Sequence, residues 1–248
     1  MGRPLGQHFL FQHSILARIA EAACPEQVDL CIEIGPGPGG LTEFLHPRAK
    51  RLIAIELDAT LAERLRERYC ENPSVEIVQG DVLSTNLGQW GRATVCGNLP
   101  YYITSPIVEQ VLAIGSALER AVFLVQKEVA DRLGAGPGSR DYGYLSVATQ
   151  LFCSVERLFL VKPASFQPPP KVDSAVVRLT PRPAIPVADP KAFLRFASAC
   201  FRQKRKTLRN NLAGQYGGER LSGLPEAGLR GEQLGLGELI RLFETLTG

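Results

Sequence analysis

The sequence lacks the paired cysteines of zinc-ribbon and thioredoxin-type proteins. Six cysteines occur in 248 residues, but none stands in a C-x-x-C pair, so neither kind of site is supported. Several lie inside apolar runs, which is typical of buried free thiols. We therefore expect reduced cysteines, no bound metal and a cytoplasmic protein. The six are Cys24, Cys31, Cys70, Cys96, Cys153 and Cys200.

Long apolar runs are also missing. No uninterrupted run approaches the roughly 20 residues of a membrane-spanning helix. The first ten residues, MGRPLGQHFL, show neither the apolar core nor the cleavage site of a signal peptide. With 45% hydrophobic and 21% charged residues, the composition is that of an ordinary globular protein. We expect no membrane partner and, by default, a monomer.

Acidic residues are absent from one basic stretch, residues 191–212. The whole chain has a net charge of only +3, which permits a nucleic-acid partner without requiring one. A solvated helix usually mixes charge signs, so we interpret this stretch as a helix that contacts phosphate groups, with a plain solvated surface as the alternative. The candidate RNA-binding residues are Arg202, Lys204, Arg205, Lys206 and Arg209.

Strand and helix patterns alternate along the first 180 residues. Such alternation is typical of an α/β fold with a doubly wound, mostly parallel Rossmann-like sheet. Ser14 is a candidate N-cap of the first helix. The predicted strands are Val28–Ile34, Arg51–Leu57, Val75–Gln79, Arg92–Gly97, Arg120–Gln126, Val155–Val161 and Ser174–Thr180, and the predicted helices are Ser14–Cys24, a short one ending at Leu45, Ala59–Tyr69, Pro106–Ile114, Lys127–Leu133 and Tyr144–Phe152.

A proline-rich segment divides the chain. PRPAIPVADP, Pro181–Pro190, predicts a linker. We expect a ligand-binding domain over residues 1–180 and a small all-helical domain over residues 191–248. The last two strands before the linker are joined by a short proline-rich loop, so we expect them to form an antiparallel hairpin at the edge of the sheet.

A glycine-rich turn, EIGPGPGGLT (Glu33–Thr42), follows the first predicted strand and opens a helix. Gly35, Gly37 and Gly40 satisfy the G-x-G-x-x-G spacing, and Glu56 stands about 20 residues further on, where a carboxylate can accept from both ribose hydroxyls of a nucleoside. This pattern alone does not separate NAD from S-adenosylmethionine. The prolines at 36 and 38 remove N–H donors from a phosphate cradle, and Glu33 could accept from an ammonium group, so both favour S-adenosylmethionine. A turn without a ligand is the alternative.

Asp81 and Val82 follow the third predicted strand. A carboxylate there can accept from an adenine amino group while the valine contacts the ring. A helix N-cap or a turn residue is the commoner role of a lone Asp after a strand. The position of Asp81 after Glu33 and Glu56 in a series of strand ends favours the ligand, because ligands of such sheets bind outside the carboxyl ends of the strands.

The loop GNLPYYIT, Gly97–Thr104, follows the fourth predicted strand. An aromatic amine must become more tetrahedral before it attacks a methyl sulfonium, and acceptors on its N–H groups favour that change. The Asn98 side-chain oxygen and the Leu99 carbonyl, ahead of Pro100, can be those acceptors. Tyr101 can stack on the base, an interaction of roughly 1–3 kcal/mol. A proline-anchored turn whose tyrosines cap the core is the alternative.

These motifs together resemble the ribosomal RNA adenine dimethylases. GQHFL (Gly6–Leu10) is similar to the family's N-terminal cofactor motif, and EIGPGPGGLT, IELD (Ile55–Asp58), the Gly80–Asp81 pair and GNLPYYIT match in order and spacing. FQPPPKVDSAVV (Phe166–Val177) is similar to its loop after the sheet, and FRQKRKTLRNNL (Phe201–Leu212) to its basic C-terminal helix. The resemblance covers nearly the whole chain.

The resemblance implies a cofactor, a substrate and site residues. S-adenosylmethionine would be held at its methionine end by His8, Leu10 and Gly35, at its ribose by Glu56 and at its adenine by Asp81, with Asn98 at the transfer centre. The substrate would be two adjacent adenines near the 3′ end of small-subunit ribosomal RNA, each dimethylated in the immature subunit. His8 and Tyr102 stand where Asn is common in the family.

Phe166 is a further candidate, for the opposite face of the flipped base, because enzymes that act on bases stack them between apolar groups; an ordinary loop anchor is the alternative. Three other functions compete with small-subunit dimethylation. They are a large-subunit RNA methylase of the antibiotic-resistance type, a non-catalytic ribosome-assembly factor and, least favoured, an NAD-dependent dehydrogenase.

Overall fold

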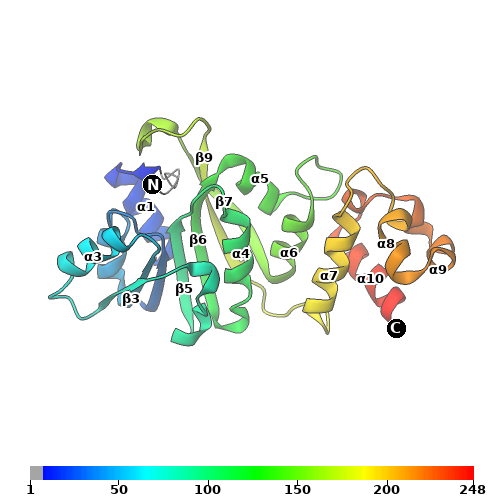
Figure 1. The fold of residues 1–248 in the computed structure, drawn as a ribbon, viewed down its shortest axis with the longest axis horizontal. Coiled ribbons are helices and arrows are strands. Elements are labelled where there is room, and N and C mark those ends of the chain that lie inside the picture. The colour runs from blue at the N-terminus through cyan, green and yellow to red at the C-terminus, as the bar shows by residue number, and fades with distance from the viewer. Residues whose placement is uncertain (1–7) are drawn as a thin grey trace. The chain divides into compact units, whose positions relative to one another are not determined.

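A computed structural model describes residues 8–248 of the protein, and contacts divide them into two compact units (Figure 1). Unit 1 comprises the described part of Met1–Ala130 together with Ser154–Pro181, and unit 2 comprises Asp131–Cys153 together with Arg182–Gly248. The second segment of unit 2 therefore begins at Arg182, inside the expected linker Pro181–Pro190. Unit 2 also takes in residues 131–153, which we expected in the first domain, because Tyr142, Val147 and Leu151 share an apolar core with the C-terminal helices.

A seven-stranded sheet in the order β4-β3-β2-β5-β6-β9-β7 forms the centre of unit 1. The first five strands in this order pair in parallel, and β9 runs antiparallel to β6. This is the predicted doubly wound sheet. The strands are β2 (Val28–Ile34), β3 (Ala49–Glu56), β4 (Val75–Gln79), β5 (Ala93–Asn98), β6 (Leu118–Gln126), β7 (Cys153–Val161) and β9 (Ser174–Pro181).

The predicted antiparallel hairpin is confirmed at the edge of this sheet, where β7 and β9 are neighbours. The Ser154 hydroxyl donates to the Thr180 carbonyl at one end, and the Lys162 ammonium pairs with the Asp173 carboxylate at the other. Residue numbers thus rise along one segment while they fall along the other. The hairpin turns the sheet from parallel to antiparallel without adding a helical crossover.

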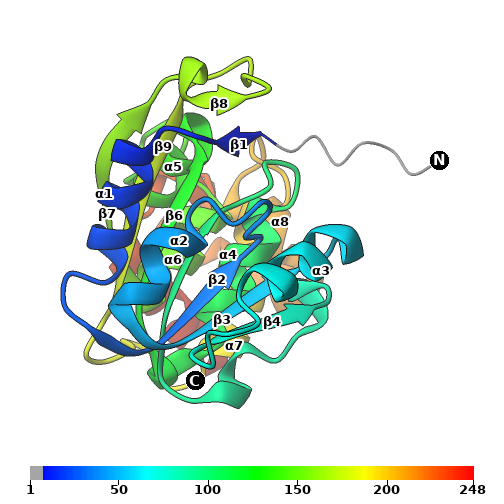
Figure 2. The same cartoon turned by 90° about the vertical axis from the view of Figure 1, so that its left-hand side faces the viewer.

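Helices cover both faces of the sheet. α1 (His13–Ala23) and α2 (Thr42–Leu45) bury Leu16, Ile19 and Leu45 against side chains such as Cys96 and Val122. Side chains that alternate with these along the strands point to the other face, where α4 (Thr104–Leu112) lies, and Figure 2 shows α1 and α4 on opposite sides of the strands. α3 (Ala59–Arg68) follows β3, and the Asp58 side chain caps it by accepting from two backbone N–H groups.

A second, two-stranded sheet was not predicted from the sequence. β1 (Phe9–Leu10) pairs antiparallel with β8 (Phe166–Gln167), and Figure 2 shows the two side by side. Strands of two residues carry no detectable period, and their partners are far apart in the chain, so pattern analysis cannot find them. The pairing brings Phe9 and Leu10 of the GQHFL motif beside Phe166 and Gln167, which begin the loop FQPPPKVDSAVV. No sequence pattern indicated that these two motifs are in contact.

Unit 2 is helical. Its core is aromatic, with the Phe193 and Phe196 rings 5.6 and 5.5 Å from the ring of Phe243. The Asp189 and Thr207 side chains cap α7 and α8 by accepting from backbone N–H groups. The helices are α6 (Tyr144–Phe152), α7 (Pro190–Phe201), α8 (Leu208–Tyr216), α9 (Gly218–Ser222) and α10 (Leu236–Thr247), and α5 (Lys127–Gly134) crosses the boundary with unit 1.

Two local predictions were wrong. α1 begins at His13 after Gln12, so Ser14 lies inside the first turn and is not the N-cap. The basic stretch is not one helix, because α7 ends at Phe201, α8 begins only at Leu208, and the residues between them form bends and turns. Lys and Arg are good helix formers, so the sequence there gives no sign of the break.

Among residues 8–248, no helix is both long and apolar enough to span a bilayer.

Candidate active site

Four parallel strands end side by side at one edge of the sheet in unit 1. In spatial order, β4, β3, β2 and β5 end at Gln79, Glu56, Ile34 and Asn98. The chain order reverses between β2 and β5, which is where open α/β sheets bind ligands. A pocket of about 760 Å³, including its part open to solvent, lies at this edge.

The glycine-rich turn forms one side of the pocket. Gly35 and Gly37 have φ angles of 67° and 56°, which favour glycine. The Gly35 N–H donates to the Ile55 carbonyl at 2.9 Å, and the Gly37 N–H donates to Glu56 Oε2 at 2.9 Å. Residues 36 and 38 are prolines and have no N–H. From 35 to 38 the turn therefore has no free donor for a pyrophosphate, which argues against a dinucleotide.

Glu56 lies at the end of β3 with both carboxylate oxygens oriented by backbone. Its side chain is only 2% exposed, and it lines the pocket. Oε2 accepts from the Gly37 N–H, and Oε1 accepts from the Asp58 N–H at 2.9 Å. Each carboxylate oxygen keeps a second lone pair, so two hydroxyl donors can still be accepted. This matches the predicted role of holding a ribose.

Asp81 lines the pocket just after the end of β4, and it also has the commoner role of a helix N-cap. Its Oδ1 accepts from the Leu83 N–H at 2.9 Å and caps the short helix Val82–Ser84. Val82 lines the pocket as well. Leu57, directly after Glu56, is 48% exposed and lines the same pocket. An apolar space bounded by Leu57 and Val82, next to the Asp81 carboxylate, suits a flat heterocycle with an amino group.

Asn98 lines the pocket at the end of β5, and its amide orientation follows from one hydrogen bond. The Asn98 Nδ2 donates to the His8 carbonyl at 3.0 Å, so Oδ1 is left as an acceptor. In the next turn, the Pro100 carbonyl accepts from the Ile103 N–H and the Thr104 hydroxyl. The Leu99 carbonyl has no hydrogen-bond donor within the described residues. Two neighbouring oxygens, Asn98 Oδ1 and Leu99 O, are therefore available as acceptors.

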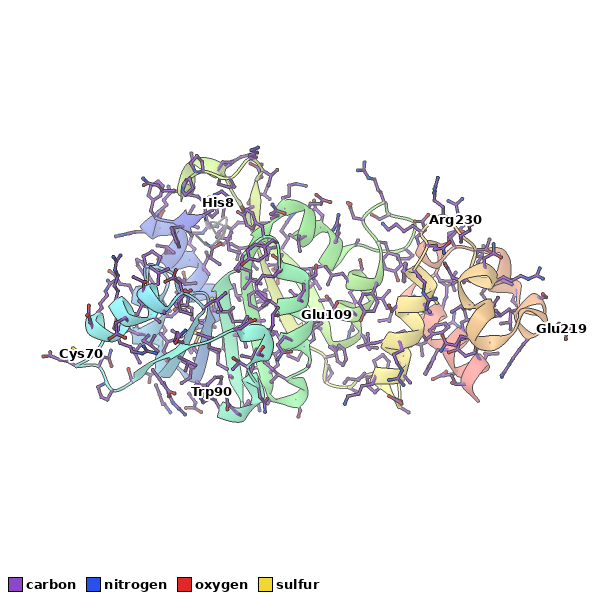
Figure 3. All side chains as sticks on the ribbon, viewed as in Figure 1. His8, Cys70, Trp90, Glu109, Glu219 and Arg230 are labelled. Carbon is purple, nitrogen blue, oxygen red and sulfur yellow. The ribbon has the colours of Figure 1, made fainter. Side chains whose placement is uncertain are left out.

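Tyr101 and His8 form an aromatic wall of the pocket. The Tyr101 hydroxyl lies 2.7 Å from the Ser174 hydroxyl on β9, and burial raises the pKa of this phenol. The His8 ring lies 5.5 Å from the Tyr101 ring. His8 Nδ1 lies 2.7 Å from the Pro168 carbonyl, which can only accept, so Nδ1 carries the proton. His8, labelled in Figure 3, thus links the Asn98 amide, the Tyr101 ring and the proline-rich loop.

Three predicted site residues do not line the pocket. Phe166 is 2% exposed and packs in the core of unit 1, as a loop anchor would, and its contact with a flipped base stays a prediction. Leu10 pairs with it across the two-stranded sheet and is buried in the same core. Glu33 is 1% exposed and lies behind the turn; burial, with the Glu56 charge nearby, raises its pKa to about 8. Because Glu33 does not line the pocket, its expected contact with an ammonium group stays a prediction.

The five basic candidates lie in unit 2 on and beside the turn between α7 and α8. All are exposed, and within the described residues none forms an ion pair. Lys204 Nζ donates to the Arg140 carbonyl at 3.3 Å. The five side chains therefore form an exposed cationic surface that no carboxylate within residues 8–248 neutralises. Four of them lie in the turn between α7 and α8, and only Arg209 lies on a helix.

Several apolar pocket residues were not predicted from the sequence. Phe9, Ile34, Ile55, Ile103 and Ile107 line it in addition to Leu57. Most are apolar residues within strands or helices, and a pattern that predicts core positions cannot show which of them face a cavity. Phe9 could have been found, because it stands inside the GQHFL motif between His8 and Leu10.

Comparison with known proteins gives the family of this chain. A profile of the family described as "Ribosomal RNA adenine dimethylase" matches residues 2–234. Proteins named "Ribosomal RNA small subunit methyltransferase A" are similar to this chain. The one from Acidobacterium capsulatum is 46% identical and covers 98% of this chain and 90% of its own, and the one from Geobacter metallireducens is 43% identical over 98% and 94%.

Solved structures show the same fold. A dimethyladenosine transferase from Plasmodium falciparum superposes with a TM-score of 0.81 at 27% identity, covering 95% of this chain and 96% of its own. The 23S rRNA methyltransferase ErmE superposes with a TM-score of 0.72 at 30% identity, covering 97% and 100%. The family profile matches most of this chain, and the two relatives named above are more than 40% identical to it. This chain therefore belongs to the ribosomal RNA adenine dimethylases, a family of methyltransferases.

Proposed function

We propose that this protein transfers methyl groups from S-adenosylmethionine to the N6 amino groups of two adjacent adenines near the 3′ end of small-subunit ribosomal RNA. Dimethylation of this RNA would make it a maturation factor of the small subunit. The observation that supports the proposal most is the pair of available acceptors, Asn98 Oδ1 and Leu99 O, in a pocket that also holds two carboxylates at strand ends.

The pocket residues fit S-adenosylmethionine better than a dinucleotide. Glu56 can accept from two ribose hydroxyls, and Asp81 with Leu57 and Val82 can hold an adenine. The turn at 35–38 has no free N–H for a phosphate, and this cofactor has none. His8 and Gly35 stand where the methionine end would lie. When bound, the cofactor supplies an electrophilic methyl group on a positively charged sulfur.

Asn98 and Leu99 would prepare the adenine amine for attack. Hydrogen bonds from its two N–H groups to Asn98 Oδ1 and Leu99 O favour a tetrahedral nitrogen and direct its lone pair away from the ring. The His8 carbonyl prevents the Asn98 amide from turning its NH₂ group toward the amine. Tyr101, held by Ser174, would stack on the base.

The acceptor pair also bears on dimethylation. The first transfer leaves one N–H on the amine and the second leaves none. The product therefore satisfies neither acceptor, and buried acceptors without donors cost free energy. We expect release to be favoured only after the second methylation.

The exposed basic turn of unit 2 would contribute phosphate contacts. Such contacts position an RNA without reading its sequence, so RNA shape and the assembled particle would supply specificity.

The test uses labelled S-adenosylmethionine with small subunits that lack these methyl groups, followed by mapping of the modified bases. We expect label on N6 of two adjacent adenines near the 3′ end. Absence of label on adenine would refute the enzymatic proposal, and label only on large-subunit RNA supplied in parallel would replace it with the activity named for ErmE. Asn98→Ala should abolish transfer, whereas Gly136→Ala, in a loop with open space around it, should not.

A further inference from the structure

Tyr102 is an exposed aromatic residue at the pocket to which neither the fold nor the acceptor pair gives a role. Its side chain is 59% exposed, and it lines the pocket beside Tyr101. Within residues 8–248 it makes no side-chain hydrogen bond and no contact with another ring. A single exposed aromatic needs no explanation by itself, but this one stands at the mouth of the cavity that would receive the base.

The backbone that carries Tyr102 is well anchored. Leu99 is buried beneath the loop, and its N–H donates to the Leu124 carbonyl on β6 at 3.0 Å. The Pro100 carbonyl then accepts from both Ile103 and Thr104 and closes the turn at the start of α4. The Tyr102 ring is therefore presented to solvent from a fixed turn, which keeps the entropy cost of binding low.

Tyr102 is badly placed to be the second wall of the base that Tyr101 would hold. A base sandwich needs two rings that face each other. The Tyr101 ring is turned inward, with its hydroxyl on Ser174 and its face near His8, whereas Tyr102 is turned outward. The two tyrosines therefore serve different positions.

Base flipping creates a ligand for an outward aromatic ring. A base that enters an enzyme pocket leaves its stack, and the nucleotide next to it loses a stacking partner. That neighbour stays at the mouth of the pocket with one face exposed. Aromatic side chains bind such faces with little dependence on sequence.

We propose that Tyr102 stacks on the nucleobase next to the adenine being methylated, and so forms a second base-binding position outside the pocket. This rests on the proposed function, since it takes RNA adenine as the substrate. It gives Tyr102 a direct contact with RNA and places the neighbouring base, which is itself a target, on a prepared surface.

The test is a double-mutant cycle between the tyrosine and the base. Small subunits are reconstituted with RNA in which one of the two adjacent adenines is intact and the other is either intact or an abasic nucleotide. kcat/KM for methyl transfer to the always-intact adenine is measured for wild type, Tyr102→Ala and Tyr102→Phe. Phe11→Ala is the matched control, because Phe11 is 55% exposed and does not line the pocket.

On particles with both adenines, Tyr102→Ala should lose roughly 5- to 150-fold in kcat/KM, the value of one base–aromatic stack. Tyr102→Phe and Phe11→Ala should stay within about twofold of wild type. On abasic particles, wild type should fall to the level of Tyr102→Ala, and Tyr102→Ala should show no added loss. Full activity of Tyr102→Ala on intact particles, or an equal loss on both particles, would overturn the proposal.

Two further measurements separate this proposal from its alternatives. The Kd of S-adenosylhomocysteine should be the same for wild type and Tyr102→Ala; a clear weakening would assign Tyr102 to the cofactor. If wild type methylates no particle, the proposed function fails, but stacking is still measured by quenching of 2-aminopurine in a single-stranded oligoribonucleotide. Equal quenching by wild type and Tyr102→Ala would then refute the contact.

Discussion

Gly97→Ala tests whether the spacing of two strands positions Asn98. Gly97 lies on β5 directly before Asn98, and a Cβ added there would lie 2.5 Å from the Ile34 carbonyl oxygen on β2. Ordinary contact begins at 3.4 Å, and the obstacle is backbone, which cannot rotate away. The strands must therefore separate locally by several tenths of an ångström, and the displacement falls on the residue that would orient the amine.

The expected magnitude has two parts. Overpacking a core costs about 1–3 kcal/mol, which for a chain of this length lowers Tm by roughly 2–12 °C. A misplacement approaching 1 Å at a reacting group costs on the order of 100-fold in rate. We expect a folded variant whose kcat for methyl transfer is lower by about 10- to 100-fold. Cofactor affinity should change little, because Glu56 lies on β3 and Asp81 follows β4.

The assay combines kcat on unmethylated small subunits, calorimetric binding of S-adenosylhomocysteine and thermal unfolding. Gly136→Ala is the matched control, since a Cβ there meets nothing within 4 Å and its φ is not positive. If Gly97→Ala keeps the wild-type kcat while its Tm falls, the strand spacing does not control the position of Asn98, and that part of the reasoning is refuted.

Four other predictions follow from the site. Asn98→Ala should lose methyl transfer by at least about 100-fold while cofactor binding survives; an equal loss of binding would contradict the division of roles. Glu56→Ala should weaken cofactor binding, because the carboxylate accepts two backbone N–H groups and faces the pocket, and calorimetry measures it. Glu33→Gln should flatten the pH dependence of Tm. The pKa of Glu33 in the folded protein, about 8, lies above its ordinary value, so wild type loses stability as pH rises from about 4.5 through 8. The amide of the variant does not titrate and loses none. Lys204→Ala with Arg205→Ala should raise KM for the particle and reduce its salt dependence, without changing cofactor affinity.

Much of the fold could be predicted from the sequence, because the sheet follows local rules. β2, β4 and the helix Tyr144–Phe152 have the predicted bounds, and the other strands of the seven-stranded sheet differ by one or two residues at their ends. Alternating strands and helices force parallel pairing with the carboxyl ends at one edge. The row formed by Glu56, Asp81 and Asn98 was therefore accessible from the order of the motifs alone.

Which of the candidate residues face the pocket could not be predicted from local sequence patterns. Phe166 and Leu10 pair across two short strands and enter the core, and Glu33 is buried, which raises its pKa to about 8. The basic stretch breaks at Thr207, which caps α8, so a turn presents most of its charges. Burial and long-range pairing depend on residues distant in the chain, and local patterns carry no information about them.

The loop GNLPYYIT illustrates both sides of this division. That an Asn, a prolyl peptide and two tyrosines follow a strand at the ligand-binding edge could be predicted from the sequence, because strand order and strand ends are set locally. The orientations of these side chains depend on the folded chain. Asn98 donates from Nδ2 to the His8 carbonyl, which leaves its Oδ1 as an acceptor, and Tyr101 points inward while Tyr102 points outward. Side-chain orientation depends on which distant groups are within hydrogen-bonding reach, and only the folded chain brings His8 and Ser174 to this loop.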